Sequence, residues 1–319
     1  MNEPRLNYVL CPGAAAVASL PGREAAPTGM HRMAYWEWNA TGDPDHPHVV
    51  ICVHGLSRQG RDFDTLAQAL STRVRVICPD VVGRGQSDWL ADPMGYQIPH
   101  YAADMLALLA QLHHRAPMQT LDWVGTSMGG LIGMAVAGQA GVALPVPMRR
   151  LVLNDVGPVI QWDALQRIGL YLGQPVQFGS LQHAADALWA ISTSFGPHTP
   201  QQWLDLSRAM VRKLPDGGFT WHYDPAIAMA FRSLTQDAAA AGEATLWQLY
   251  DLITARTLLL RGADSDLLSR QTAHAMSMRG PRATMVEFEG VGHAPTLVAD
   301  HQVRTVADFL LAAEGVAAA

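Results

Sequence analysis

The sequence is poor in cysteine. Its 319 residues include three cysteines: Cys11 in a Pro/Gly-rich segment, and Cys52 and Cys78 inside apolar runs. An odd number of cysteines without paired spacing does not indicate a disulfide framework. Cysteines in apolar runs are typical of small buried side chains in a reducing compartment. The sequence therefore predicts a cytoplasmic protein without structural disulfides.

Clusters of basic residues are also absent. The formal net charge is −6 at pH 7, and lysine and arginine do not gather into the patches that follow nucleic-acid phosphates. This composition argues against nucleic acid as a partner.

Long hydrophobic runs are missing as well. No segment approaches the roughly 18 uninterrupted apolar residues of a membrane span, so we expect a soluble protein without membrane contact. The N-terminal stretch "YVLCPGAAAVASL" is apolar, but Pro12 and Gly13 interrupt it, and Glu3 accompanies Arg5 where a secretory signal would be basic. We expect residues 1–30 to form a loose leader.

The rest of the chain alternates short apolar runs with helical patterns. Continuous apolar runs are typical of parallel strands covered on both faces. Strands are predicted at 33–39, 48–53, 74–78, 121–125, 150–154, 257–261 and 284–288, and helices at 62–70, 101–114, 128–140, 269–278 and 302–313. This order indicates an open, mostly parallel α/β sheet.

One interval breaks the alternation. Residues 155–256 separate two predicted strands, although a parallel crossover needs only about a dozen residues or more. We interpret the excess as a helical cap at 158–242, inserted between core halves at 31–157 and 243–319. The cap should contain helices at 162–172, 180–191 and 201–214, and we expect its tryptophans to roof an apolar pocket: Trp162, Trp189, Trp203 and Trp221.

The segment "LDWVGTSMGGLIGMA" carries the strongest chemical signal. It places Gly-x-Ser-x-Gly between a predicted strand and a predicted helix, which is the pattern of a nucleophile elbow. Small neighbours allow the sharp turn that exposes the hydroxyl of Ser127. The start of the following helix favours negative charge there. We therefore predict Ser127 as a nucleophile.

A serine nucleophile requires a base and an acid that orients the base. His293, in "FEGVGHAPTL", follows the last predicted strand at the expected end of the sheet and is the candidate base. Three aspartates follow apolar strands at the same end, namely Asp155, Asp264 and Asp266. Local pattern alone does not separate them.

Ester hydrolysis also needs two amide donors for the oxyanion. The residue after the nucleophile supplies one, which is the backbone N–H of Met128. The loop after an early strand supplies the other, and "VVICVHGLSRQG" points to the amide of Leu56.

Five segments occur in the order seen in the α/β-hydrolase superfamily: "HGLSRQGRDF", "PDVVGRGQSD", "GTSMGG", "RGADSDLL" and "GVGHAPTL". The chain resembles this family along nearly its whole length. The resemblance implies an eight-stranded, mostly parallel core with a cap between the sixth and seventh strands, Ser127 as nucleophile and His293 as base. The spelling Gly-x-x-Ser-Asp resembles members whose second aspartate is the acid, which favours Asp266. The resemblance also implies that His54 holds the oxyanion loop.

No cofactor or metal is predicted. The Gly83–Arg84–Gly85 stretch lacks the lysine and helix start of a P-loop. The histidine pairs that could suggest a metal have no cysteine or carboxylate cluster to complete a site: His46 with His48, and His113 with His114.

Together these features predict a serine carboxylic-ester hydrolase for small to medium, largely apolar esters, with hydroxyalkanoate oligomers or lactones as possible substrates. The alternatives are a carbon–carbon bond hydrolase of vinylogous diketones, a cofactor-free perhydrolase or haloperoxidase, and a small-molecule receptor without turnover. The sequence does not indicate the oligomeric state.

Overall fold

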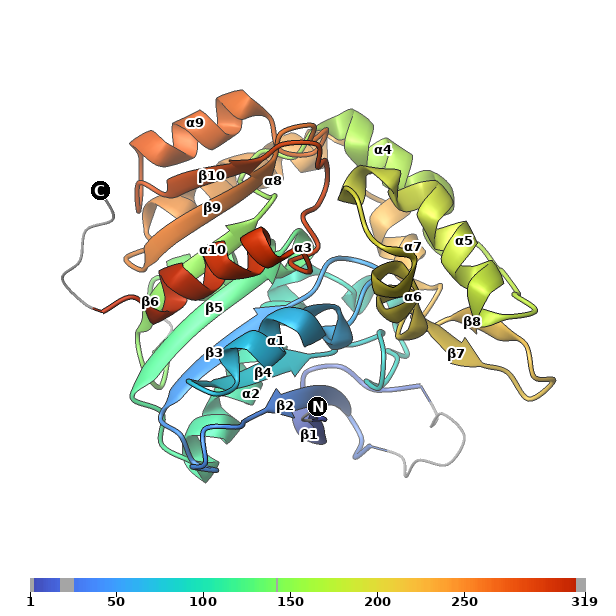
Figure 1. Cartoon of the computed structure of the whole chain (residues 1–319), viewed down its shortest axis with the longest axis horizontal. Helices are drawn as coiled ribbons and strands as arrows, with labels where there is room; N and C mark the ends of the chain where they lie inside the picture. Colours follow the sequence, from blue (N-terminus) through green and yellow to red (C-terminus); the bar gives the residue numbers. More distant parts are fainter. Residues whose placement is uncertain (1–2, 18–25, 142, 314–319) are drawn as a thin grey trace.

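A computed structural model of the chain describes residues 3–17, 26–141 and 143–313. A central sheet lies between two layers of helices, and a cap projects beyond one end of the strands (Figure 1). The eight strands have the order β1-β2-β4-β3-β5-β6-β9-β10. They are β1 (Arg5–Pro12), β2 (Met30–Trp38), β3 (His48–Val53), β4 (Arg75–Pro79), β5 (Thr120–Thr126), β6 (Met148–Asn154), β9 (Arg256–Gly262) and β10 (Thr284–Phe288).

The sheet is parallel from β4 to β10, while β1 and β2 pair antiparallel and β2 pairs antiparallel with β4. The predicted fold class, an eight-stranded and mostly parallel α/β sheet, is confirmed. The central strands are continuous apolar runs because helices cover both of their faces. In β3, for example, Val49 and Ile51 pack on one face and Val50 and Cys52 on the other.

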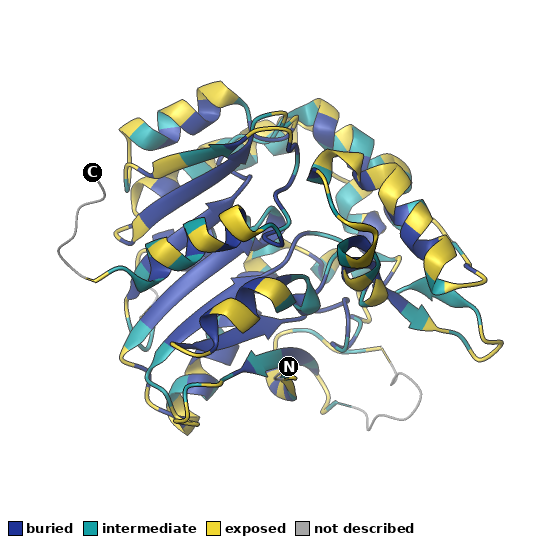
Figure 2. Ribbon diagram, viewed as in Figure 1, coloured by how far each residue is buried: buried dark blue, intermediate teal, exposed yellow. Residues whose placement is uncertain are grey.

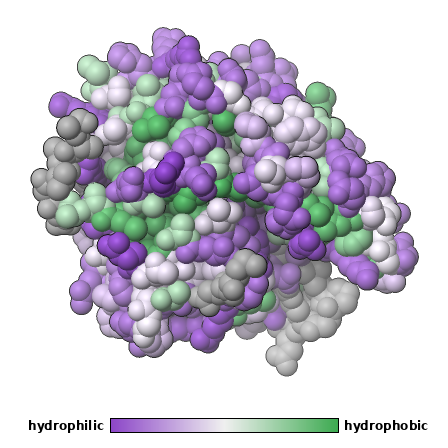
Figure 3. All heavy atoms as spheres, in the orientation of Figure 1, coloured by the Kyte–Doolittle hydropathy of each residue, from purple (hydrophilic) through white to green (hydrophobic). Residues whose placement is uncertain are grey.

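Two sets of helices cover the sheet. One face packs against α2 (Ile98–Arg115), α3 (Met128–Gly138), α8 (Gln236–Asp251) and α9 (Arg270–Met278), and the other against α1 (Asp64–Leu70) and α10 (Asp300–Leu311). The inner sides of α1 and α10 are buried and their outer sides exposed (Figure 2). The face of the molecule on which these two helices lie is largely hydrophilic, with patches of hydrophobic residues between the hydrophilic ones (Figure 3). None of the helices within the described ranges is long and apolar enough to cross a bilayer.

The expectation of a loose leader over residues 1–30 is wrong for β1. This strand pairs with β2 along its whole length, from Arg5 opposite Glu37 to Pro12 opposite Met30. Its burial alternates, with Val9 and Cys11 inward and their neighbours exposed, as expected of an edge strand with one covered face. Residues 18–25 of the same predicted leader lie outside the described residues.

The chain between β6 and α8 forms the cap, and it is not purely helical. It comprises α4 (Trp162–Tyr171), α5 (Leu181–Ser192), the 3₁₀ turn η3 (Thr193–Phe195), α6 (Pro200–Arg208), the hairpin β7 (Val211–Lys213) with β8 (Phe219–Trp221), and α7 (Ile227–Arg232). The helix predicted over 201–214 ends at Arg208, and the chain then enters the hairpin. The predicted cap boundary at residue 242 falls inside α8, one continuous helix.

Candidate active site

Ser127 occupies the sharp turn between β5 and α3. Its backbone has φ 52° and ψ −118°, a left-handed conformation that is uncommon for a residue with a side chain. The neighbouring glycines make room for the turn, because a Cβ on Gly125 would collide with Gly129 and one on Gly129 would collide with Val53. Met128 begins α3, so its amide has no acceptor within the helix.

His293 lies beside this turn, in the loop after β10. Its Nε2 is 3.0 Å from Ser127 Oγ, and its Nδ1 is 2.7 Å from Asp155 Oδ2. A carboxylate only accepts hydrogen bonds, so Nδ1 carries the proton and Nε2 is free to accept the serine hydroxyl proton. Two consecutive hydrogen bonds thus connect the carboxylate of Asp155, the imidazole of His293 and the hydroxyl of Ser127.

Asp155 is fully buried in the turn after β6, with φ 55°. Its carboxylate accepts three hydrogen bonds: from the Gly262 amide at 2.9 Å, from Ser265 Oγ at 2.6 Å and from His293 Nδ1. These donors satisfy the buried carboxylate, which in turn holds the imidazole in one orientation.

The prediction that Asp266 lies against His293 is wrong. Asp266 turns outward, with a side chain half exposed, and binds Arg167 of α4 at 2.7 Å. Asp264 is also exposed. The loop after β9 contributes two hydrogen-bond donors, Gly262 and Ser265, to the carboxylate of Asp155, which lies in the loop after β6.

Leu56 and Met128, the predicted oxyanion donors, line the same pocket as Ser127. His54 is fully buried beside Leu56; its Nδ1 donates to the Gly55 carbonyl at 2.7 Å and its Nε2 accepts from the Val81 amide at 2.9 Å. Burial lowers the pKa of His54 to about 3, so the ring is neutral. The hydrogen bonding expected of His54 is therefore confirmed. It fixes the Gly55–Leu56 peptide, which carries the Leu56 N–H.

The cap contacts the histidine loop directly. Ser194 Oγ donates to the carbonyl of His293 at 2.9 Å, and the Gly292 amide donates to the Ser194 carbonyl at 2.6 Å. The turn η3 thus holds the backbone on both sides of the imidazole.

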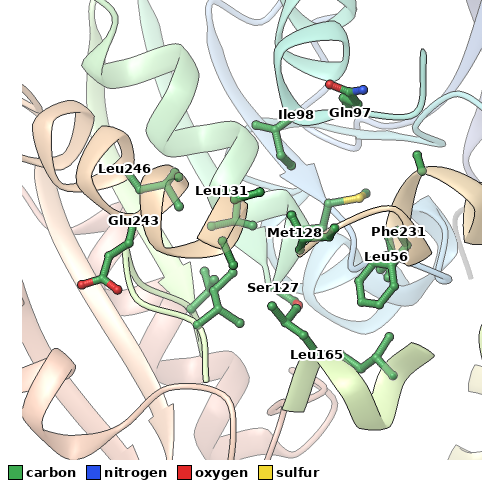
Figure 4. Close-up of a pocket in the computed structure, with 18 of the residues that line it drawn as sticks. Leu56, Gln97, Ile98, Ser127, Met128, Leu131, Leu165, Phe231, Glu243 and Leu246 are labelled. Carbon is green, nitrogen blue, oxygen red and sulfur yellow. The ribbon is translucent and has the colours of Figure 1, made fainter. Parts of the chain in front are cut away.

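A pocket of about 710 Å³ opens at Ser127 between core and cap. Apolar side chains from α3, α4, α7 and α8 line it, among them Leu131, Leu165, Phe231 and Leu246 (Figure 4). Glu243 is the one charged residue among the described residues that line it.

The prediction that four cap tryptophans roof the pocket is wrong for three of them. Trp162 lines the pocket, but Trp203 packs against Trp189 inside the cap, and Trp221 packs against Phe178. Aliphatic side chains and Phe231 take the place of the other three tryptophans.

The family follows from comparison with known proteins. Residues 50–309 match the alpha/beta hydrolase family. The chain belongs to this family. It is a hydrolase, and it is 47% identical over 315 residues, 98% of its own length and 99% of the relative's, to a 3-hydroxybutyrate-oligomer hydrolase of Cupriavidus necator.

Two further relatives are similar along most of the hydrolase. A crystal structure of an alpha/beta hydrolase from Novosphingobium aromaticivorans has a TM-score of 0.78 and 33% identity, and covers 97% of this chain and 99% of that one. A pimeloyl-[acyl-carrier protein] methyl ester esterase of Chromobacterium violaceum is 25% identical over 268 residues, which are 82% of this chain and 93% of that protein.

A second buried cluster lies away from the pocket of the hydrolase. Donor atoms of Cys11, His31 and Asp104 lie within 4.8 Å of one another. His31 Nδ1 contacts the Ala14 carbonyl at 3.2 Å and Nε2 contacts Asp104 Oδ2 at 3.0 Å. Although burial disfavours the charged ring, the hydrogen bond and the charge of Asp104 raise the pKa of His31. With an acceptor on each nitrogen, His31 fits a buried ion pair that attaches β2 to α2.

Three residues of the site were not predicted: Gly262, Ser265 and Ser194. Ser265 stands in the segment that drew attention to Asp266, but a serine beside two aspartates gives no sign that its own hydroxyl faces the site. Ser194 lies in the cap and carries no local signal. Their roles depend on contacts between segments distant in sequence.

Proposed function

We propose that this hydrolase cleaves carboxylic esters of hydroxyalkanoate oligomers through an acyl-enzyme, with Ser127 as nucleophile, His293 as general base and acid, and Asp155 as the orienting acid. The observation that carries the proposal is the relay from Asp155 through His293 to Ser127 at the wall of an apolar pocket. The similarity to a 3-hydroxybutyrate-oligomer hydrolase supports the substrate class.

In the first half of the reaction, His293 Nε2 takes the proton of Ser127 as the hydroxyl oxygen attacks the ester carbonyl carbon. The amides of Leu56 and Met128 stabilise the negative charge on the carbonyl oxygen. The imidazolium then gives its proton to the leaving alkoxide, and the hydroxyalkanoyl group remains on Ser127.

In the second half, water takes the place of the alcohol. His293 removes a proton from the water as its oxygen attacks the acyl-enzyme, and then returns a proton to Ser127. Asp155 stays ionised and stabilises the imidazolium in both halves. The products are a hydroxy acid and a shortened oligomer that ends in a hydroxyl group.

The pocket agrees with this substrate class. Its volume is within the range of small-molecule sites, roughly 300–1,000 Å³, and its lining suits the methyl and methylene groups of a polyester chain. Glu243 adds a negative charge, so we expect acyl groups without a nearby negative charge to be preferred.

The test measures acid release from 3-hydroxybutyrate oligomers of defined length by the wild type and by Ser127→Ala. We expect Ser127→Ala to keep the fold and to lose nearly all turnover, and a fluorophosphonate to label Ser127 in the wild type. Labelling of a different serine, or full activity of Ser127→Ala, would contradict the proposal. Cleavage of a vinylogous diketone without ester turnover would favour the carbon–carbon hydrolase.

A further inference from the structure

Arg84 stands behind the proposed oxyanion site, in the loop after β4. Its side chain is completely buried. Nε donates to the Leu56 carbonyl at 2.8 Å, and Nη1 donates to the Val82 carbonyl at 2.7 Å and to Tyr101 Oη at 3.0 Å. Nη2 lies 3.6 Å from Met128 Sδ. One guanidinium thus contacts both residues whose amides would hold the oxyanion.

Among the residues that the structure describes, no carboxylate forms an ion pair with Arg84. Within the described ranges, its side-chain contacts are two carbonyls, a phenol and a thioether, with the Tyr101 and Tyr96 rings 5.0 Å and 5.7 Å from the guanidinium carbon. A buried cation without an anionic partner is costly, and apolar residues of similar volume often replace buried charges without loss of stability. Stability alone therefore does not account for an arginine here.

The hydrogen bond to Leu56 complements that of His54. His54 holds the carbonyl of Gly55, and therefore the peptide that carries the Leu56 N–H. Arg84 holds the carbonyl of Leu56, and therefore the next peptide. Because both peptide planes around its Cα are held, the backbone of Leu56 has little freedom to turn its N–H away from the pocket.

The loop of Arg84 is itself fixed by the cap. The Gly85 amide donates to the His222 carbonyl at 2.9 Å, and the Asp224 amide donates to the Gly83 carbonyl at 2.7 Å. Tyr101 of the core therefore holds the guanidinium of Arg84, and the cap holds the backbone on both sides of this residue.

We propose that Arg84 is a positioning residue of the oxyanion site, which fixes Leu56 and Met128 and places an uncompensated positive charge behind the developing oxyanion. The inference rests on the proposed ester hydrolysis. Charge that develops only in the transition state is stabilised most by fixed charges in a buried environment, so the effect should fall on kcat and leave KM nearly unchanged.

The experiment compares Arg84→Met, Arg84→Gln and Arg84→Lys in turnover of a 3-hydroxybutyrate oligomer, with melting temperatures measured in parallel. We expect Arg84→Met to lower kcat by about 10²-fold, the size of losing one oxyanion donor, with KM within about threefold. Arg84→Gln can still donate to Leu56 but has no charge, and should lose at least about tenfold. Arg84→Lys should recover about tenfold or more over Arg84→Met.

Arg75→Met is the matched control, because Arg75 is also buried but is paired with Glu37. It should lower the melting temperature and leave kcat unchanged.

If Ser127→Ala is inactive while Arg84→Gln and Arg84→Met keep kcat, the role of Arg84 is refuted and ester hydrolysis stands. Losses confined to KM and melting temperature would refute it equally. If Arg84→Met does not fold, the kcat of Arg84→Gln is compared with that of Arg84→Lys, and a kcat no higher in Arg84→Lys refutes the role of the charge. If Ser127→Ala remains active, the proposed function itself fails.

Discussion

The loops after β6 and β9 both carry aspartates at the same end of the sheet, but their aspartates lie in opposite environments. Asp155, after β6, is fully buried with three hydrogen-bond donors around its carboxylate. Asp266, after β9, is half exposed and binds an arginine of the cap. The difference teaches that the position of an aspartate after a strand does not decide its role. The direction of its side chain and the donors available to it do.

The second loop nevertheless takes part in the site. Gly262 and Ser265 donate to Asp155, so one loop carries the proposed acid and the other carries two donors that stabilise its carboxylate. Three predictions test this division.

The largest effect is expected at Asp155. Asp155→Asn removes the charge that stabilises the imidazolium and favours the wrong tautomer of His293, so kcat should fall by about 10⁴-fold. Asp266→Asn should stay within about threefold of the wild type. Steady-state kinetics on one ester substrate measure both. Equal losses in the two variants, or a larger loss for Asp266→Asn, would overturn the assignment of the acid.

A smaller effect is expected at Ser265. Ser265→Ala removes one hydrogen bond to the carboxylate of Asp155, an interaction of about 1.5–3 kcal/mol for a charged acceptor. Because Gly262 and His293 still donate to that carboxylate, we expect kcat to fall by about tenfold. Ser269→Ala, at the N-cap of α9, is the control: it should cost about 1 kcal/mol of stability without changing kcat. Unchanged kcat in Ser265→Ala would show that this donor is dispensable.

The smallest effect concerns the ion pair of Asp266 with Arg167, which joins the core to α4. Both side chains are exposed, and exposed pairs contribute about 0.2–1 kcal/mol. Asp266→Asn should therefore lower the free energy of unfolding by less than about 1 kcal/mol, as measured by urea denaturation. A loss above about 2 kcal/mol would mean that this pair holds the cap in place.

The order of the core elements could be predicted from the sequence. The central strands are continuous apolar runs because both of their faces are buried, and the strand, Ser127 and helix α3 form one local unit whose glycines are required by close backbone contacts. His293 could be identified as the candidate base because it follows the last strand of the predicted sheet. These features depend on neighbours in sequence or on repeated local patterns, which the amino-acid order contains directly.

Other features were decided by the tertiary structure. The strand β1 forms because its one apolar face is covered by α2, and the short hairpin β7–β8 is joined to Phe178 by a bridge from Phe219.

The same is true of the acid. Asp155, Asp264 and Asp266 each follow an apolar strand, so the local pattern does not separate them. The contact of Asp155 with His293 depends on a left-handed turn at Asp155 and on donors from a loop about 110 positions away, whereas Asp266 lies outward beside an arginine of the cap. Such contacts exist only after distant segments have packed, because a carboxylate becomes a buried anion only where several donors from separate loops meet it.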